Sequence, residues 1–174
     1  MSSLAIILKE FNCTVYGSDL SESQFTKLLK NNNIKVCKSH TPNNLSNKIS
    51  AIIISSAIKK NNIEYDYCLK NDIPIFHRSN LLDYFISIHP YSIGVLGSHG
   101  KGSHCVNLYQ CLSSKYNCSY IIGGIFNGTN NLYSTKSDFL ICEIDESDGS
   151  FFNLNTDVLV ITNIGLDHID YLKS

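Results

Sequence analysis

Two glycines and a lysine in the middle of the chain have the spacing of a phosphate-binding turn. Gly97 and Gly100 are followed directly by Lys101. An apolar run over residues 91–96 precedes the turn, and a helix-compatible segment over residues 103–112 follows it. In a strand–turn–helix unit of this kind, backbone N–H groups point at anionic oxygens and the lysine adds a full positive charge. The pattern indicates a site for phosphate groups, although glycines at such turns can also serve backbone geometry alone.

The turn departs from the usual P-loop in its length and in one residue type. Its Gly-x-x-Gly-Lys spacing is shorter than that of a P-loop, and Gly102 stands where a hydroxyl ordinarily holds Mg2+. Ser103 lies one residue further on, about 100° round the helix axis for ~3.6 residues per turn. The turn is therefore expected to bind phosphate while lacking one metal ligand.

Two further residues are expected to lie beside the turn if the strands run parallel. Glu143 is at the tip of an apolar run over residues 139–143, and His168 lies just past another over residues 158–162. The carboxyl ends of parallel strands share one edge of a sheet, so both side chains are expected beside Lys101. A carboxylate and an imidazole can complete the coordination of a Mg2+ ion that bridges phosphates. This joint placement favours a nucleotide site over a solvated strand end and a loop histidine.

An acidic run follows Glu143 and contains Asp145, Glu146, Ser147 and Asp148. One interpretation is a solvated turn. Four hydrogen-bonding residues beside a proposed Mg2+ site are better explained as groups that orient substrate or water.

The elements that must position these residues alternate between helix and strand. The sequence predicts helices over residues 1–11, 21–31, 63–70, 79–88 and 103–112, and strands over residues 13–18, 34–37, 51–55, 74–76, 91–96, 119–122, 139–143 and 158–162. This alternation predicts βαβ units and mostly parallel sheets. Smaller signals are a brief helix over residues 42–48, a capping box of Ser21 with Gln24, and a turn at Gly123-Gly124.

In the first half of the chain, polar residues follow two of the predicted strands. Asp19 comes after the strand over residues 13–18, and Ser55 and Ser56 stand at the end of the strand over residues 51–55. Ligands of parallel sheets bind at such strand ends, so Asp19 is a candidate partner of a ribose or a base. The alternative is an aspartate that turns the chain.

Length, charge and cysteine content bound the class of protein. The 174 residues are enough to bury a core, and a seam at His89-Pro90 divides them into predicted domains of residues 1–89 and 90–174. A net charge of −1 argues against a nucleic-acid or membrane surface, and no apolar run approaches the length of a membrane span. The seven cysteines contain no Cys-x-x-Cys pair, which indicates reduced thiols. A cytoplasmic protein is expected, and the sequence does not indicate its oligomeric state.

Motifs along nearly the whole chain resemble those of the Mur ligase family. In the second half they are Gly97-Ser-His-Gly-Lys101, Glu143-Ile-Asp-Glu-Ser-Asp-Gly-Ser-Phe151 and Thr162-Asn-Ile-Gly-Leu-Asp-His-Ile-Asp-Tyr171. In the first half they are Met1-Ser-Ser-Leu-Ala5, Gly17-Ser-Asp-Leu20, Ser55-Ser-Ala-Ile58 and Ile73-Pro-Ile-Phe-His-Arg-Ser79. The Glu-x-Asp-Glu-Ser-Asp-x-Ser-Phe run is typical of the branch that adds L-alanine to UDP-N-acetylmuramate. The branch that reattaches a recycled tripeptide is the nearest alternative.

The resemblance implies a Rossmann-like UDP-binding domain followed by an incomplete P-loop-type α/β ATPase domain. It implies ATP and Mg2+ as cofactors, UDP-N-acetylmuramate and L-alanine as substrates, and an acyl phosphate intermediate that the amine attacks. The implied catalytic residues are Lys101, Glu143 and His168, the last two as Mg2+ ligands. The implied nucleotide-binding residues are Gly97, Ser98, His99, Gly100, Lys101, Gly102, Ser103 and Asn163, with Asp167 nearby, and the implied substrate-binding residues are Asp19, Ser55, Ser56, Asp145, Glu146 and Ser147.

Departures from the family leave three interpretations open. The family has a strand and a glycine-rich loop ahead of a Met-Ser-Gly-Leu-Ala segment, whereas this chain starts at Met1 and has Ser3 for that glycine. Gly102 and Ser103 replace two threonines, and the family's C-terminal domain is not in the sequence. The chain is a ligase fragment, a nucleotide- or UDP-sugar-binding module without catalysis, or an α/β protein with structural glycines. Without the first strand, neighbouring strands of the first half are expected to be unpaired on one edge.

Overall fold

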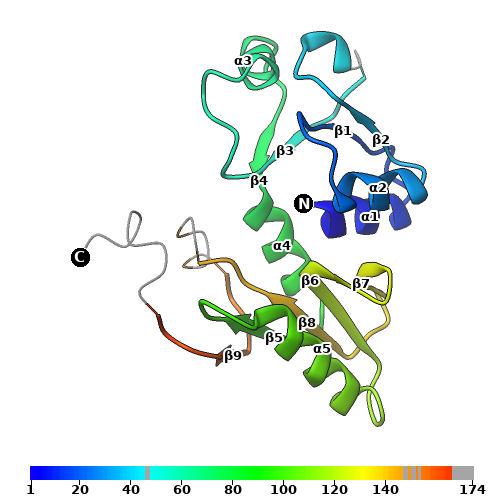
Figure 1. Cartoon of the computed structure of the whole chain (residues 1–174), viewed down its shortest axis with the longest axis vertical. Coiled ribbons are helices and arrows are strands. Elements are labelled where there is room, and N and C mark those ends of the chain that lie inside the picture. The colour runs from blue at the N-terminus through cyan, green and yellow to red at the C-terminus, as the bar shows by residue number, and fades with distance from the viewer. Residues whose placement is uncertain (46–47, 147–148, 150–151, 153, 166–174) are drawn as a thin grey trace. The chain divides into compact units, whose positions relative to one another are not determined.

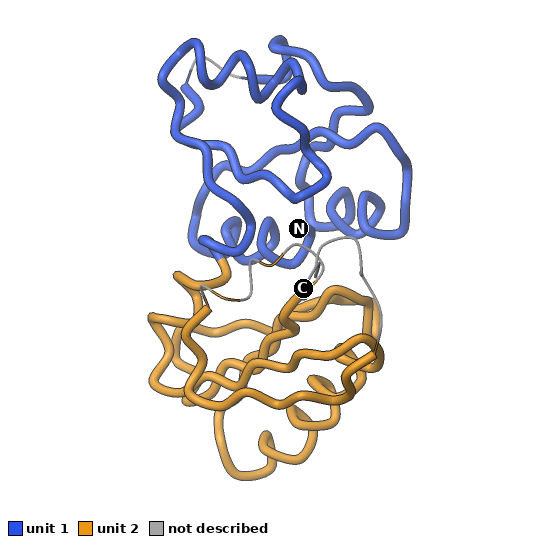
Figure 2. The backbone as a smooth tube through the Cα atoms, turned by 90° about the vertical axis from the view of Figure 1, so that its left-hand side faces the viewer, with its two compact units in different colours: residues 1–81 blue, residues 82–174 orange. Residues whose placement is uncertain are grey.

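The computed structural model describes residues 1–45, 48–146, 149, 152 and 154–165. It divides into two compact units, Met1–Leu81 and Leu82–Ser174 (Figure 2). The division lies within helix α4 (Arg78–Ser87), ahead of the seam expected at His89-Pro90. The end of α4 belongs to the second unit because the buried ring of Phe85 packs against Tyr133, with 5.3 Å between the ring centroids. Within the described ranges, no helix is long and apolar enough to cross a membrane.

Unit 1 alternates short helices with short strands (Figure 1). Its elements before α4 are α1 (Ser2–Glu10), β1 (Tyr16–Ser18), α2 (Gln24–Asn31), β2 (Lys35–Cys37), the 3-10 turn η1 (Pro42–Asn44), β3 (Ile52–Ile54), α3 (Ile63–Lys70) and β4 (Ile75–His77). Strand β1 pairs in parallel with β2, and β3 pairs in parallel with β4. These pairs form two separate two-stranded sheets. The parallel direction follows from the alternation of helices and strands along the chain. Each of the two sheets is small.

Helix α2 begins with a capping box that lies further along the chain than predicted. The Ser23 hydroxyl accepts the N–H of Thr26 at 3.3 Å, and the Thr26 hydroxyl accepts the N–H of Ser23 at 2.9 Å. The expected box of Ser21 with Gln24 is wrong, because Ser21 donates both its N–H and its hydroxyl to Asp19. Ser23 has the extended backbone that a capping residue needs, so the helix starts after it.

Unit 2 is built on one five-stranded sheet. Its elements after α4 are β5 (Tyr91–Leu96), α5 (Lys101–Leu112), β6 (Cys118–Phe126), β7 (Thr129–Leu132), β8 (Phe139–Glu143) and β9 (Val158–Ile161). The strand order is β7-β6-β8-β5-β9, and the pairs are parallel except for β6 with β7. The fully buried side chains of Val95, Cys105 and Ile141 join β5, α5 and β8 in one core cluster. This packing fixes the start of α5 beside the carboxyl ends of β5 and β8.

The chain reverses direction at Asn127 and Gly128 rather than at the predicted Gly123-Gly124 turn. That prediction is wrong, because both predicted residues lie within strand β6. Asn127 and Gly128 have φ values of 49° and 79°. Two successive residues with positive φ give the turn whose twist matches a β-hairpin, and Asn-Gly is its strongest sequence signal.

The cysteines are free thiols in the structure. Cys105 and Cys142 are fully buried in unit 2. Burial raises the pKa of the Cys142 thiol to about 12 and also raises the pKa of Cys105. These two residues are therefore packed as small, neutral, apolar side chains.

Candidate functional site

The turn between β5 and α5 has the backbone of an anion-binding turn. Gly97 has a φ of 142°, and Gly100, which caps α5, has a φ of 78°. Both values lie in the region that glycine adopts without strain. Because the capping residue is glycine, it brings no side chain to the N–H groups at the start of the helix. Such N–H groups carry the positive end of the helix dipole and bind anions.

The segment after β9 holds this turn in place. A β-carbon at Gly97 would overlap the hydroxyl of Thr162 and would lie 3.0 Å from the carbonyl oxygen of Asn163. The Asn163 amide accepts the N–H of His99 at 3.1 Å and donates to its carbonyl oxygen at 2.8 Å. The Thr162 hydroxyl donates to the same carbonyl at 2.9 Å. Asn163, expected at the nucleotide, thus supports the loop, and Thr162 is a supporting residue that the sequence analysis missed.

Lys101 points back across the turn from the first position of α5. Its ammonium donates to the carbonyl oxygen of Gly97 at 2.7 Å and to Oε1 of Glu146 at 2.9 Å. The side chain of Lys101 is 14% exposed and that of Glu146 is 13% exposed, so water screens the ion pair only in part. The other carboxylate oxygen of Glu146 is buried and has no hydrogen-bond partner among the described residues. The positive charge therefore lies over the turn, beside one carboxylate.

Glu143 approaches the same helix start from the end of β8. Its carboxylate accepts the N–H of Gly123 at 2.7 Å. A β-carbon at Gly102 would lie 3.3 Å from Oε2 of Glu143, so this carboxylate lies against the first turn of α5. The structure thus brings Lys101, Glu143 and Glu146 together around the turn, and parallel strands predicted the place of Glu143 but not the pairing of Glu146 with Lys101.

The remaining predicted site residues of unit 2 fall into two groups. Ser98 and Ser103 lie in the turn and the first turn of α5, where Ser98 accepts the N–H of Gly165 at 3.1 Å and Ser103 is exposed. Asp145 is half-buried just after β8. His168, Asp167 and Ser147 lie outside the described residues.

Two described carboxylates lie at this turn, and because Glu146 is paired with Lys101, Glu143 is the one that can receive Mg2+. No three metal-ligating side chains gather anywhere in the described ranges. Mg2+ usually binds through one or two carboxylates together with phosphate oxygens and water. The Glu143 carboxylate beside an anion-binding turn fits that type of site.

The predicted substrate residues of unit 1 lie at the carboxyl ends of strands. Asp19, just past β1, is exposed and accepts both the N–H of Ser21 at 2.9 Å and its hydroxyl at 3.1 Å. This local turn is the alternative that the sequence left open for Asp19. Ser56 follows β3, and its hydroxyl lies 3.3 Å from Nε2 of His77 at the end of β4. Ser55 is half-buried beside it.

A partly buried carboxylate in unit 1, that of Glu64, was not predicted from the sequence. Glu64 accepts hydrogen bonds from the hydroxyl of Ser18 at 2.5 Å, the amide of Asn44 at 2.7 Å and the N–H of Thr41 at 3.2 Å. Nδ1 of His40 lies 3.1 Å away. Burial by itself raises the pKa of Glu64, but these hydrogen bonds outweigh it and lower the pKa. The carboxylate thus ties the ends of β1 and β2 to α3.

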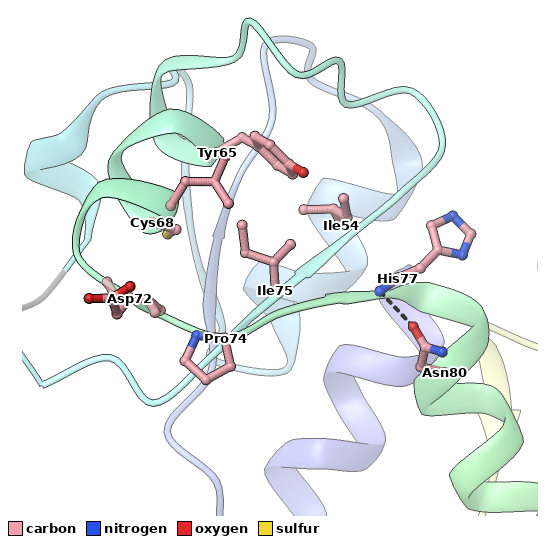
Figure 3. Close-up of a pocket in the computed structure, with 10 residues that line it drawn as sticks. Ile54, Tyr65, Cys68, Asp72, Pro74, Ile75, His77 and Asn80 are labelled. Atoms are coloured by element: carbon pink, nitrogen blue, oxygen red, sulfur yellow. Dashed lines mark hydrogen bonds between the residues drawn. The ribbon is translucent and has the colours of Figure 1, made fainter.

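A pocket of about 660 Å³ lies between α3 and the β3–β4 sheet of unit 1 (Figure 3). Ile54 and Ile75 line it from the sheet, and Tyr65 and Cys68 line it from α3. At its rim, the N–H of His77 donates to Oδ1 of Asn80 at 2.9 Å. All the residues that line the pocket belong to unit 1.

Sequence comparison identifies the family of this protein. A family model described as "Mur ligase family, catalytic domain" matches residues 1–89. The chain belongs to the Mur ligase family. The family resemblance predicted from the sequence is therefore confirmed.

Two curated relatives of this Mur ligase chain carry the name UDP-N-acetylmuramate–L-alanine ligase. The protein from Rickettsia bellii is 40% identical over 176 residues, which cover 99% of this chain and 36% of the relative. The protein from Dictyoglomus turgidum is 40% identical over 176 residues, which cover 100% of this chain and 38% of the relative. The chain thus spans little more than a third of the length of these relatives.

Solved structures of Mur ligases have the same fold. The UDP-N-acetylmuramate-alanine ligase of Thermotoga maritima superposes with a TM-score of 0.90 at 22% identity, covering 100% of this chain and 41% of that one. The UDP-N-acetylmuramate:L-alanyl-gamma-D-glutamyl-meso-diaminopimelate ligase of Neisseria meningitides superposes with a TM-score of 0.85 at 22% identity, covering 99% of this chain and 59% of that one. The predicted fold class, an α/β chain with mostly parallel sheets, is confirmed.

Proposed function

We propose that this chain is the UDP-sugar- and ATP-binding part of a ligase that joins L-alanine to UDP-N-acetylmuramate. The observation that carries the proposal is the glycine turn with Lys101 held across it and Glu143 beside it. The curated relatives named above support the choice of substrates, because their 40% identity extends over the whole chain. A cytoplasmic location remains a prediction from the sequence.

In this proposal the chain's residues bind and orient a nucleotide. The N–H groups of the turn and of the start of α5 receive the phosphate oxygens, and Lys101 offsets their negative charge. Glu143 would hold Mg2+, with His168 as the second ligand predicted from the family. ATP supplies the phosphoryl group that activates the muramoyl carboxylate, and the amine of L-alanine displaces that phosphate. Positioning and charge stabilisation by these residues are the expected means of catalysis.

Residues of the first unit would hold the UDP part of the substrate. Asp19, Ser55 and Ser56 lie at strand carboxyl ends, where parallel sheets bind ligands. Asp145, Glu146 and Ser147 are proposed on the substrate side of the second unit. The domain boundaries, residues 1–89 for UDP-sugar binding and 90–174 for ATP binding, remain part of the proposal.

Gly102 favours a second candidate, a nucleotide- or UDP-sugar-binding module without catalysis. The glycine leaves the anion-binding backbone intact but removes the hydroxyl that ordinarily ligates Mg2+ at this position. Binding and turnover are therefore tested separately.

Calorimetric titration of the 174-residue chain with ATP tests the nucleotide site. Lys101→Ala is expected to weaken ATP binding about tenfold or more, because a charge-assisted hydrogen bond to phosphate is lost. Lys115→Ala is the matched control, since Lys115 is an exposed lysine beyond the end of α5. Equal ATP affinity of the two variants would contradict the proposed site.

An ADP-release assay separates the ligase from the binding module. The 174-residue chain alone is expected to read at background with UDP-N-acetylmuramate, L-alanine, ATP and Mg2+, because it spans 36% to 38% of the ligases' length. A longer protein that contains it is expected to release ADP only with all three substrates present. Binding without any release from the longer protein would favour the binding module.

A further inference from the structure

An internal ion pair lies where the nucleotide phosphates are proposed to bind. Lys101 and Glu146 are 45 positions apart in the sequence, and Nζ of Lys101 lies 2.9 Å from Oε1 of Glu146. The second hydrogen bond of the ammonium, to the carbonyl oxygen of Gly97 at 2.7 Å, holds it over the turn. The carboxylate of Glu146 thus takes the position of an anion that faces the lysine of the turn.

The carboxylate of Glu146 is incompletely hydrogen-bonded. Oε1 pairs with Lys101, whereas Oε2 is buried and has no partner in the part of the chain that the structure describes. A buried carboxylate oxygen without a donor destabilises the arrangement that contains it. A phosphate chain has more acceptor oxygens and can also receive the N–H groups of the turn. Phosphate therefore has the means to displace Glu146 from Lys101.

We infer that Glu146 is an internal competitor of the nucleotide, which holds Lys101 in the absence of phosphate and is displaced when phosphate binds. This inference rests on the proposed nucleotide site and states what competes with the nucleotide there.

Titration of the Glu146→Gln variant with ATP in the presence of EDTA tests the competition. Removing the carboxylate charge is expected to lower the Kd for ATP about three- to tenfold, which corresponds to the loss of a partly screened ion pair. Inorganic tripolyphosphate is expected to show the same gain, because the competition concerns the lysine and not the base. Asp66→Asn is the matched control, since it removes the same charge from an exposed pair with Lys70 in unit 1. Its Kd values are expected to equal those of the unmodified chain.

Acetylation of Lys101 by acetic anhydride, followed by mass spectrometry, gives a readout that needs no nucleotide. Glu146→Gln is expected to accelerate acetylation of Lys101 about threefold or more, as the loss of a weak ion pair would. An unchanged acetylation rate, or an ATP affinity that falls or stays the same, overturns the inference.

The two proposals fail in different ways. If ATP binds and Lys101→Ala weakens it, but Glu146→Gln does not tighten it, the inference is overturned and the nucleotide site stands. If neither the unmodified chain nor Glu146→Gln binds ATP or tripolyphosphate, the proposed nucleotide site is overturned together with the inference that rests on it.

Discussion

The backbone N–H of Gly123 donates a hydrogen bond of 2.7 Å to the carboxylate of Glu143. A β-carbon at Gly123 would lie 3.2 Å from Oε1 of Glu143, and one at Gly102 would lie 3.3 Å from Oε2. The carboxylate is thus enclosed by two glycines, one from β6 and one from α5. A side chain at position 102 would touch this carboxylate directly. Position 102, where a hydroxyl side chain ordinarily stands, therefore lies next to the proposed metal-binding carboxylate of Glu143.

Gly102→Thr is expected to add a Mg2+ ligand beside Glu143. Its hydroxyl would stand next to the carboxylate after a shift of a few tenths of an ångström, because the β-carbon contact of 3.3 Å is tight. The affinity for ATP should then become about tenfold higher with Mg2+ than with EDTA, and this ratio should exceed that of the unmodified chain. Calorimetric titration under both conditions measures it.

Ser103→Ala is the control for the Gly102→Thr variant. Ser103 is exposed and lies about 100° further round the helix, so its loss is expected to leave the Mg2+ dependence of ATP binding unchanged. If Gly102→Thr leaves the ratio unchanged and Ser103→Ala lowers it, then Ser103 already ligates the metal. If neither changes it, the turn does not hold a metal–nucleotide complex.

Gly97→Ala is expected to abolish ATP binding and to destabilise unit 2 by about 1–3 kcal/mol, the cost of a residue held in an unfavourable backbone region. Its φ of 142° and its contact with Thr162 both exclude a β-carbon. Urea unfolding measures the stability, and calorimetry measures the binding. Gly124→Ala is the matched control, because a β-carbon there meets no atom within 4 Å, and its effect should stay within about 0.5 kcal/mol. A Gly97→Ala variant as stable as the control would mean that the turn has another backbone conformation.

The sequence predicted the order of elements because each local signal is contained in a few neighbouring residues. Short apolar runs identified the strands of both units, and parallel pairing followed from the helices between these strands. The hairpin at Asn127 and Gly128 carries an Asn-Gly signal that outweighs the two glycines before it. The start of α2 was misplaced because two serines compete for the capping position, and the partner of Ser21 is Asp19.

The sequence predicted only those parts of the candidate site that belong to a recognisable local pattern. The turn at Lys101 and the carboxylate of Glu143 follow from the glycine pattern and from strand ends. The partner of Lys101 does not, because Glu146 is 45 positions away and a single sequence gives no contact between them. The network around Glu64 was missed for the same reason, since Ser18 is 46 positions away. Side-chain partners at such separations depend on how the elements pack.

Glu64→Gln is expected to reduce the free energy of unfolding of unit 1 by about 1–3 kcal/mol at pH 7, because partly buried donors lose a charged acceptor. Hydrogen bonds lower the pKa of Glu64 below its ordinary value of 4.5, so its contribution is complete above that pH. The contribution is lost as the pH falls through the lowered pKa of the folded state. The stability difference between the two proteins should therefore be largest near neutrality and shrink below about pH 4.5. Urea unfolding from pH 7 to pH 3 measures it.

Asp66→Asn controls for the loss of one acidic charge, because its exposed pair with Lys70 should contribute little at any pH. The imidazole of His40 contacts the same carboxylate as Ser18, so the comparison is repeated in a His40→Gln background. If Glu64→Gln lowers the free energy of unfolding by the same amount at pH 7 and at pH 3, the carboxylate charge does not stabilise the fold.

The sheets of unit 1 have open edges in the described part of the chain. Asp19 donates its N–H to the carbonyl oxygen of Cys37, so the N–H of Ser18 points to the opposite edge of β1. Ile52 donates to the carbonyl oxygen of Pro74, so the N–H of Ile53 points away from β4. Each sheet has two strands, and neither of these edges pairs with another described strand.

Amide hydrogen exchange of the 174-residue chain is expected to be fast at Ser18 and Ile53. Two-stranded sheets of three residues a strand are marginal by themselves, and open edges also favour association between molecules. Val95 is the internal reference, because β5 is paired on both edges by β8 and β9. Exchange at Ser18 and Ile53, followed by NMR, should be at least about a hundredfold faster than at Val95. Equal protection at all three amides would mean that another segment, of this chain or of a second molecule, pairs with β1 and β3.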